Sequence, residues 1–118
     1  EQPVLVRQFA GQSMDALKLM AEKLAALCDQ EKRPYVLMLA TDADGKAGFV
    51  CAVSADLVQR GIKAGELVKE AATVTGGGGG GRPNFAQAGG KDVSRIAEAL
   101  RTVEEKLKHQ LESTPAGS

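Results

Sequence analysis

The glycine-rich stretch from residue 76 to residue 90, which reads GGGGGGRPNFAQAGG, constrains this chain more than any other part of it. Glycine has no Cβ, so a run of six can adopt positive φ angles and approach a ligand closely, but ordering it costs much chain entropy. A flexible linker would continue with Ser, Thr or more Gly. Here a cation, a proline, an aromatic residue and two amides follow, which indicates a binding surface.

The chemistry of this stretch favours an anion as the ligand. Consecutive N–H groups in mixed αR and αL conformations form a concave nest for phosphate oxygens, and a following helix N-terminus adds partial positive charge. Arg82 can add bidentate contacts at the edge. The spacing is not G-x-G-x-x-G after a strand, and no Lys-Ser or Lys-Thr follows the glycines. We therefore expect a glycine-rich loop that contacts phosphate without a nucleotide-binding fold.

Composition limits how the chain can attract a polyanion. Of its 118 residues, 43% are hydrophobic and 25% are charged, which is typical of a soluble globular domain. Lys plus Arg equals Asp plus Glu at 15 each, so the whole molecule has no long-range attraction for nucleic acid. The glycine stretch and the residues after it carry a local excess of positive charge, because Arg82, Lys91 and Arg95 outnumber Asp92. We expect only a few phosphate contacts and a shallow salt dependence.

Hydrophobic periodicity and capping residues predict an α/β (α+β) fold: a compact mixed sheet with a central hairpin, flanking helices, a glycine-rich loop and a C-terminal helix. The expected strands are residues 4–9, 35–41 and 48–53, and the expected helices are 14–30, 55–59, 64–73 and 93–111, with Ser13 and Asp92 as caps and 74–75 extended. The predicted domain spans residues 1–112, and residues 113–118 form a disordered tail.

The residue types of catalytic and metal sites are scarce. Cys28 and Cys51 are expected to be buried reduced thiols, and His109, as the single histidine, excludes a His/Cys zinc cluster within this chain. Asp42 and Asp44 lack the later ligands of a calcium loop. No Ser-His-Asp, Cys-His or paired-carboxylate arrangement is evident, so we expect neither catalytic nor metal-binding residues. Without a signal peptide or a membrane-spanning run, the chain is interpreted as one domain of a longer cytoplasmic polypeptide.

The glycine stretch resembles the signature of the DHH-associated domain, most closely the version at the C-terminus of alanyl-tRNA synthetases. That pattern is a glycine run, a basic residue, Pro, two variable positions, Ala-Gln-Ala-Gly-Gly and an acidic residue. Here it is formed by Gly76 to Gly81, Arg82, Pro83, Ala86 to Gly90 and Asp92. The motif covers about a seventh of the chain, and the order of the surrounding elements fits the family over most of the rest.

The resemblance implies a domain that binds tRNA(Ala) at the outer elbow of the L-shaped molecule and helps aminoacylation and editing by the parent synthetase. The parent would be an ATP-dependent alanine–tRNA ligase using ATP, Mg and Zn, whereas this fragment would be non-catalytic and hold no cofactor. Its partners would be tRNA(Ala) and other synthetase domains, without a membrane, in the cytoplasm or an organelle. The candidate contacts are Gly76, Gly77, Gly78, Gly79, Gly80, Gly81, Arg82, Asn84, Phe85, Gln87 and Lys91, with Arg95 added from local charge.

The role of Phe85 and two other functions of the domain stay open. Phe85 either stacks on a base or ribose or anchors the loop in the core. The domain could instead bind nucleic acid for a DHH-type exonuclease or phosphoesterase, whose catalytic motif would lie elsewhere. A third interpretation takes the seam from Ile96 to Leu111 as a surface for a partner helix or a weak homodimer.

Overall fold

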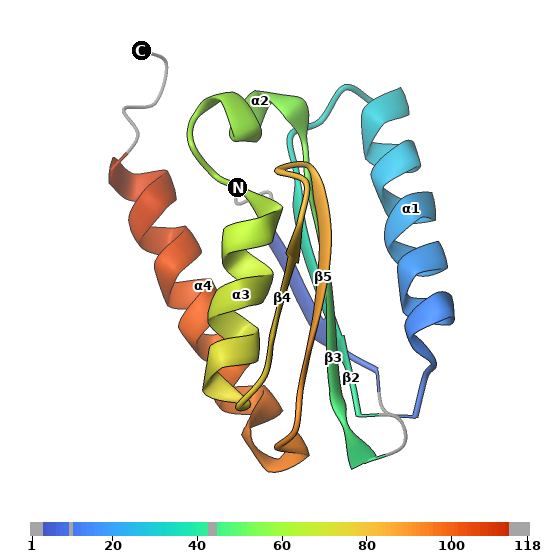
Figure 1. Ribbon diagram of the computed structural model, residues 1–118. Helices are drawn as coiled ribbons and strands as arrows, with labels where there is room; N and C mark the ends of the chain where they lie inside the picture. The colour runs from blue at the N-terminus through green and yellow to red at the C-terminus, as the bar shows by residue number, and fades with distance from the viewer. Residues whose placement is uncertain (1–3, 10, 43–44, 114–118) are drawn as a thin grey trace.

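A computed structural model of the chain describes residues 4–9, 11–42 and 45–113 as a mixed five-stranded sheet between two helical layers (Figure 1). The strands are β1 (Val4–Gln8), β2 (Val36–Thr41), β3 (Ala47–Val53), β4 (Gly78–Gly81) and β5 (Phe85–Gly90). The helices are α1 (Met14–Gln30), α2 (Ala55–Gln59), α3 (Ala64–Val74) and α4 (Ile96–Ser113), the last preceded by the 3₁₀ turn η2 (Val93–Arg95).

The sheet has the strand order β1-β2-β3-β5-β4, in which only β1 and β2 are parallel. The crossover between these two strands is α1, as a parallel connection requires. The antiparallel β2–β3 hairpin pairs Val36 with Val53 at the centre of the sheet. These features confirm the predicted fold class, the central hairpin and the C-terminal helix.

Local sequence explains why the elements form where they do. The Ser13 hydroxyl accepts a hydrogen bond from the N–H of Ala16 at 3.1 Å, which caps α1 as predicted. Leu17 and Ala21 then bury one face of that helix. All six residues of β2 are buried, so the prediction that this strand is covered on both faces is confirmed.

The two faces of the sheet are covered unequally. On one face α1 packs over β2 and β3, whereas on the other α3 packs over β3, β4 and β5 and α4 packs beside it over β1 and β2 (Figure 1). The larger apolar cluster lies on the α3 and α4 side and includes Phe49 and Met38. Because α1 lies over the middle of the sheet, the β5 and β4 end is more open on that face than on the other.

The C-terminal helix directs its apolar seam into the domain itself. Its buried side chains join the larger core cluster and are Ile96, Ala99, Leu100, Val103 and Leu107. Cys51 is buried in the same cluster, and this burial raises the pKa of its thiol. Among the described residues, no helix is long and apolar enough to cross a membrane.

Three sequence predictions need correction. The expected glycine-rich loop is a β-hairpin formed by β4 and β5, because its backbone pairs along the edge of the sheet. Val74 and Thr75 are not extended, since α3 continues through Val74 and Thr75 is its C-cap. Asp92 does cap a helical segment, but that segment is the 3₁₀ turn η2 before α4.

Some predictions fall outside the described residues. They concern Asp44 in the turn between β2 and β3 and residues 114–118 of the expected tail. Ser113, which was expected to begin that tail, is the last residue of α4. The domain span of residues 1–112 stays a prediction.

Candidate functional site

The glycine hairpin begins at the C-terminal cap of α3. Gly76 has a φ of 78°, a left-handed conformation that favours glycine. Its N–H donates to the carbonyl of Thr73 at 3.2 Å. The N–H of Gly77 donates to the carbonyl of Ala72 at 2.7 Å. This pair of hydrogen bonds is a Schellman motif, so the first two glycines end the helix and set the direction of β4.

Thr75 fixes the base of the hairpin from the buried side. Its carbonyl accepts hydrogen bonds from the N–H groups of Lys91 at 2.9 Å and Asp92 at 3.0 Å. Its hydroxyl donates to the carbonyls of Ala71 and Ala72. The end of α3 and the end of β5 are thereby held together.

The tip of the hairpin is fixed as firmly. Arg82 and Phe85 exchange two backbone hydrogen bonds, of 3.1 and 3.3 Å, around a two-residue turn. The carbonyl of Pro83 accepts the N–H of Ala64 at the start of α3 at 2.7 Å, and the carbonyl of Asn84 accepts the N–H of Val53 at 2.9 Å. The segment is therefore anchored at both ends, as the sequence predicted, although as a strand pair.

The strand conformation rules out the predicted concave nest over residues 78–81, because extended N–H groups alternate in direction. Counting from the Arg82–Phe85 pair, this alternation directs Gly80 and Gly78 toward β5 and leaves Gly81 and Gly79 on the free edge. Of the run of six, the N–H groups of Gly79 and Gly81 therefore point away from β5, and the backbone of Gly81 lies close to Gly65 of α3.

The glycines also differ in the space around them. A Cβ at Gly79 would lie 2.5 Å from the Cα of Ala88, and one at Gly81 would lie 2.8 Å from the Cα of Ala86. At Gly77 it would lie 2.6 Å from the Cα of Gly90. At Gly78 and Gly80, by contrast, a Cβ would meet nothing within 4 Å. Close strand packing thus requires glycine at alternate positions only.

The predicted side chains do not form one cluster. Arg82 and Asn84 are exposed at the tip, whereas Lys91 and Arg95 are exposed beyond the base. The intervening strand β5 runs for five residue steps of about 3.4 Å, or roughly 17 Å. Gln87 is exposed midway along β5, so the candidates line the hairpin from end to end.

Phe85 and Arg95 are already engaged within the domain. Phe85 is half-buried and packs against both apolar clusters on the α1 side, which favours the anchoring role. Arg95 donates to the Glu98 carboxylate at 2.6 and 3.3 Å. This hydrogen bond raises the pKa of Arg95 and lowers the pKa of Glu98. Binding RNA through Arg95 would therefore compete with an existing ion pair.

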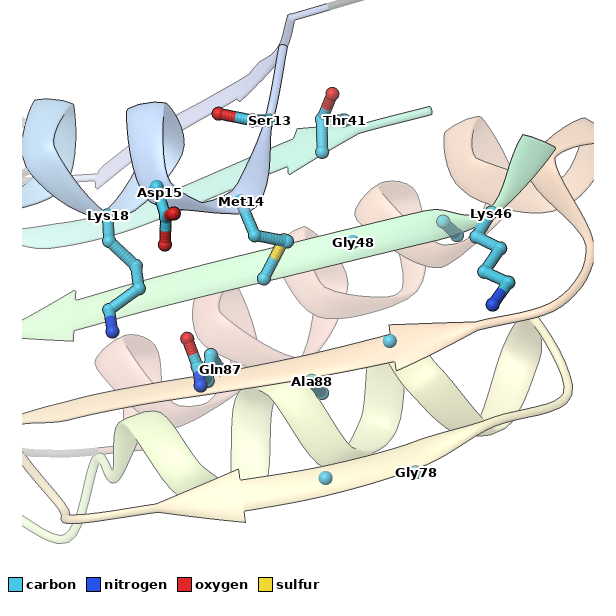
Figure 2. A pocket seen from close by; sticks show the side chains of 13 residues that line it. Ser13, Met14, Asp15, Lys18, Thr41, Lys46, Gly48, Gly78, Gln87 and Ala88 are labelled. Atoms are coloured by element: carbon cyan, nitrogen blue, oxygen red, sulfur yellow. The ribbon is translucent and has the colours of Figure 1, made fainter. Parts of the chain in front are cut away.

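Sequence reasoning missed four lysines that lie beside the hairpin. Lys18 and Lys46 line a groove between α1 and the hairpin (Figure 2), and Lys63 and Lys69 line a second groove between α3 and β4. They belong to distant segments, and only the tertiary fold brings them to the glycines. Among the described residues, no group of three or more His, Cys, Asp or Glu side chains could hold a metal ion.

The mixed sheet and the edge strand of four glycines define the class of protein. It is a small α+β domain whose backbone, without side chains, is exposed at one edge of the sheet. The chain belongs to the DHHA1 domain family, which matches residues 1–109. This finding confirms the resemblance drawn from the glycine stretch.

Curated relatives of the chain include alanine–tRNA ligases from several bacteria. The chain is 45% identical over 106 residues to the enzyme of Halalkalibacterium halodurans. This alignment covers 90% of this chain and 12% of the relative. It is 47% identical over 102 residues to that of Geobacillus kaustophilus, covering 86% of this chain and 11% of the relative. The chain therefore spans about an eighth of the length of the curated relatives it matches.

Solved structures agree with this assignment. The C-Ala domain of Aquifex aeolicus alanyl-tRNA synthetase superposes with a TM-score of 0.73 at 29% identity, covering 86% of this chain and 87% of that one. A DHH domain from a member of the s1p family of ribosomal proteins superposes with a TM-score of 0.58 at 14% identity, covering 76% of this chain and 21% of the other. The second likeness shows a shared fold alone. The chain is thus a DHHA1 domain of the kind that alanyl-tRNA synthetases carry.

Proposed function

We propose that this domain binds tRNA(Ala) at the elbow through the glycine hairpin and thereby aids aminoacylation and editing by a parent alanine–tRNA ligase. The observation that carries the proposal is a side-chain-free edge strand, anchored at base and tip, in a domain whose relatives are these ligases. ATP, Mg and Zn would serve other domains of the parent enzyme, and tRNA would be the ligand of this one.

The chemistry of the hairpin suits a folded RNA better than a single strand. The chain contains 3% aromatic residues and no Trp, and Phe85 is half-buried, so stacking on splayed bases would be weak. The free-edge amide of Gly79 and the exposed side chains of Arg82 and Gln87 can instead contact phosphates and hydroxyls at fixed positions.

The test compares intact tRNA(Ala) with an acceptor-stem duplex that lacks the elbow, at one salt concentration, for the wild-type chain and Arg82→Ala. We expect tighter binding of intact tRNA, and a loss of about 1–3 kcal/mol in the variant if Arg82 makes a charge-assisted hydrogen bond. Since Arg82 is exposed and makes no ion pair within the described part of the chain, its removal should leave folding intact. Equal affinity for both RNAs would reject elbow recognition.

A further inference from the structure

Two grooves flank β4, one on each side of the sheet. The groove between α1 and the hairpin, here called the α1 groove, has a volume of about 670 Å³. The groove between α3 and β4, here called the α3 groove, has a volume of about 240 Å³. Each is lined by two lysines, Lys18 and Lys46 in the first and Lys63 and Lys69 in the second. Binding through the hairpin can therefore use either side.

Glycines from three strands form part of the lining of the α1 groove. Gly78 and Gly89 are paired across β4 and β5 and both line the groove. A Cβ at Gly78 would meet nothing within 4 Å, so strand packing does not require glycine there. On the opposite face, by contrast, a Cβ at Gly79 would collide with Ala88. On the open face a ligand can therefore approach the backbone of Gly78 without meeting a side chain.

Polar groups surround these glycines. Figure 2 shows Lys18 extending from α1 toward Gln87 on β5, and Lys46 beside the start of β3. Within the described residues neither lysine makes an ion pair, and Asp15 is the one carboxylate lining the groove. The N-terminal turn of α1 borders it as well and adds partial positive charge.

We propose that an RNA strand of the bound tRNA lies in the α1 groove, with phosphates at Lys18 and Lys46 and its ribose faces against Gly78 and Gly89. The Gln87 amide hydrogen-bonds to a sugar hydroxyl or base edge. This assignment rests on the proposed function and adds to it the side of the sheet and two cations outside the glycine stretch. Phosphate contacts of this kind set orientation and bring salt dependence, without reading sequence.

The deciding experiment measures tRNA affinity over a range of salt concentrations for two double variants with the same change in net charge. Lys18→Gln with Lys46→Gln removes the cations of the α1 groove, and Lys63→Gln with Lys69→Gln removes those of the α3 groove. The first pair should lower affinity about tenfold or more and reduce the slope of log K against log salt by about two. The second pair should leave both quantities nearly unchanged.

A third variant tests the glycine lining of the groove without changing charge. Gly78→Val places a β-branched side chain, which strands favour, into open space. The melting temperature should therefore stay unchanged, while the affinity for tRNA falls. Unchanged affinity in this variant, or equal losses in the two lysine pairs, would overturn the α1 groove assignment while leaving tRNA binding in place. Failure of the wild-type chain to bind tRNA would reject the proposed function, and this assignment with it.

Discussion

At the scale of the residue, the glycine run holds positions under different physical constraints. Gly76 requires its positive φ, whereas Gly77, Gly79 and Gly81 require the absence of a Cβ. Gly78 and Gly80 are under neither constraint in the folded domain. Six identical residues thus play at least three roles, which composition alone could not separate.

This difference predicts opposite effects for two neighbouring substitutions. Gly79→Ala should lower the free energy of unfolding by about 1–3 kcal/mol, because the new methyl group collides with Ala88 and the strands must separate. Gly78→Ala should raise it by about 0.4–1 kcal/mol, because the unfolded chain loses freedom and the folded chain gains no clash. Urea unfolding of both variants measures this, and a similar loss in both would contradict the steric account.

At the scale of the element, the sequence predicted the helices best. The spans 14–30 and 55–59 agree with α1 and α2 at both ends, because Ser13 caps the first and apolar spacing marks its buried face. The buried strands β2 and β3 were also within one residue of their predicted starts. Capping and periodicity are local signals, so they can be identified without the tertiary fold.

The strand β4 could not be predicted in the same way. Glycine is depleted in strands and carries no alternating side chains to show a face. What makes Gly78–Gly81 a strand is its pairing with β5 and its packing beside α3, both of which arise from tertiary structure. The same reason hid Lys18 and Lys46, which lie far from the glycines in sequence and reach them only through the fold.

The cap between α3 and β4 supports a prediction at this scale. Gly76→Ala should lower the free energy of unfolding by about 1 kcal/mol, because a left-handed φ is costly for a residue with a Cβ. Gly76→Asn is the matched control, since Asn tolerates this conformation better and should cost less. Thermal unfolding of both variants gives the comparison, and an equal cost would show that φ is not the cause.

At the scale of the whole molecule, unequal cover of the sheet determines both the core and the open surface. The helices α3 and α4 cover one face and bury the seam predicted for a partner helix as far as Leu107, while the side chain of Leu111 lies outside the described part of the chain. On the other face α1 covers β2 and β3 and leaves the groove beside the hairpin. The apolar seam therefore serves the domain's own core.

This arrangement predicts a monomer in solution. With Ile96, Val103 and Leu107 buried inside the domain, α4 leaves little apolar surface up to residue 110 to drive association. Sedimentation equilibrium of the isolated chain at high concentration should give the mass of a single 12.3 kDa chain. A concentration-dependent dimer would contradict this expectation.

The steric requirement for glycine at every second position of the glycine run has a consequence for how the sequence can evolve. In a descendant under no selection for ligand binding at the hairpin, Gly77, Gly79 and Gly81 would still be held by the geometry of the sheet, while Gly78 and Gly80 could be replaced. Every second glycine would disappear and the rest would persist. The spacing of the survivors would then record the packing of the sheet, whatever ligand the surface had held.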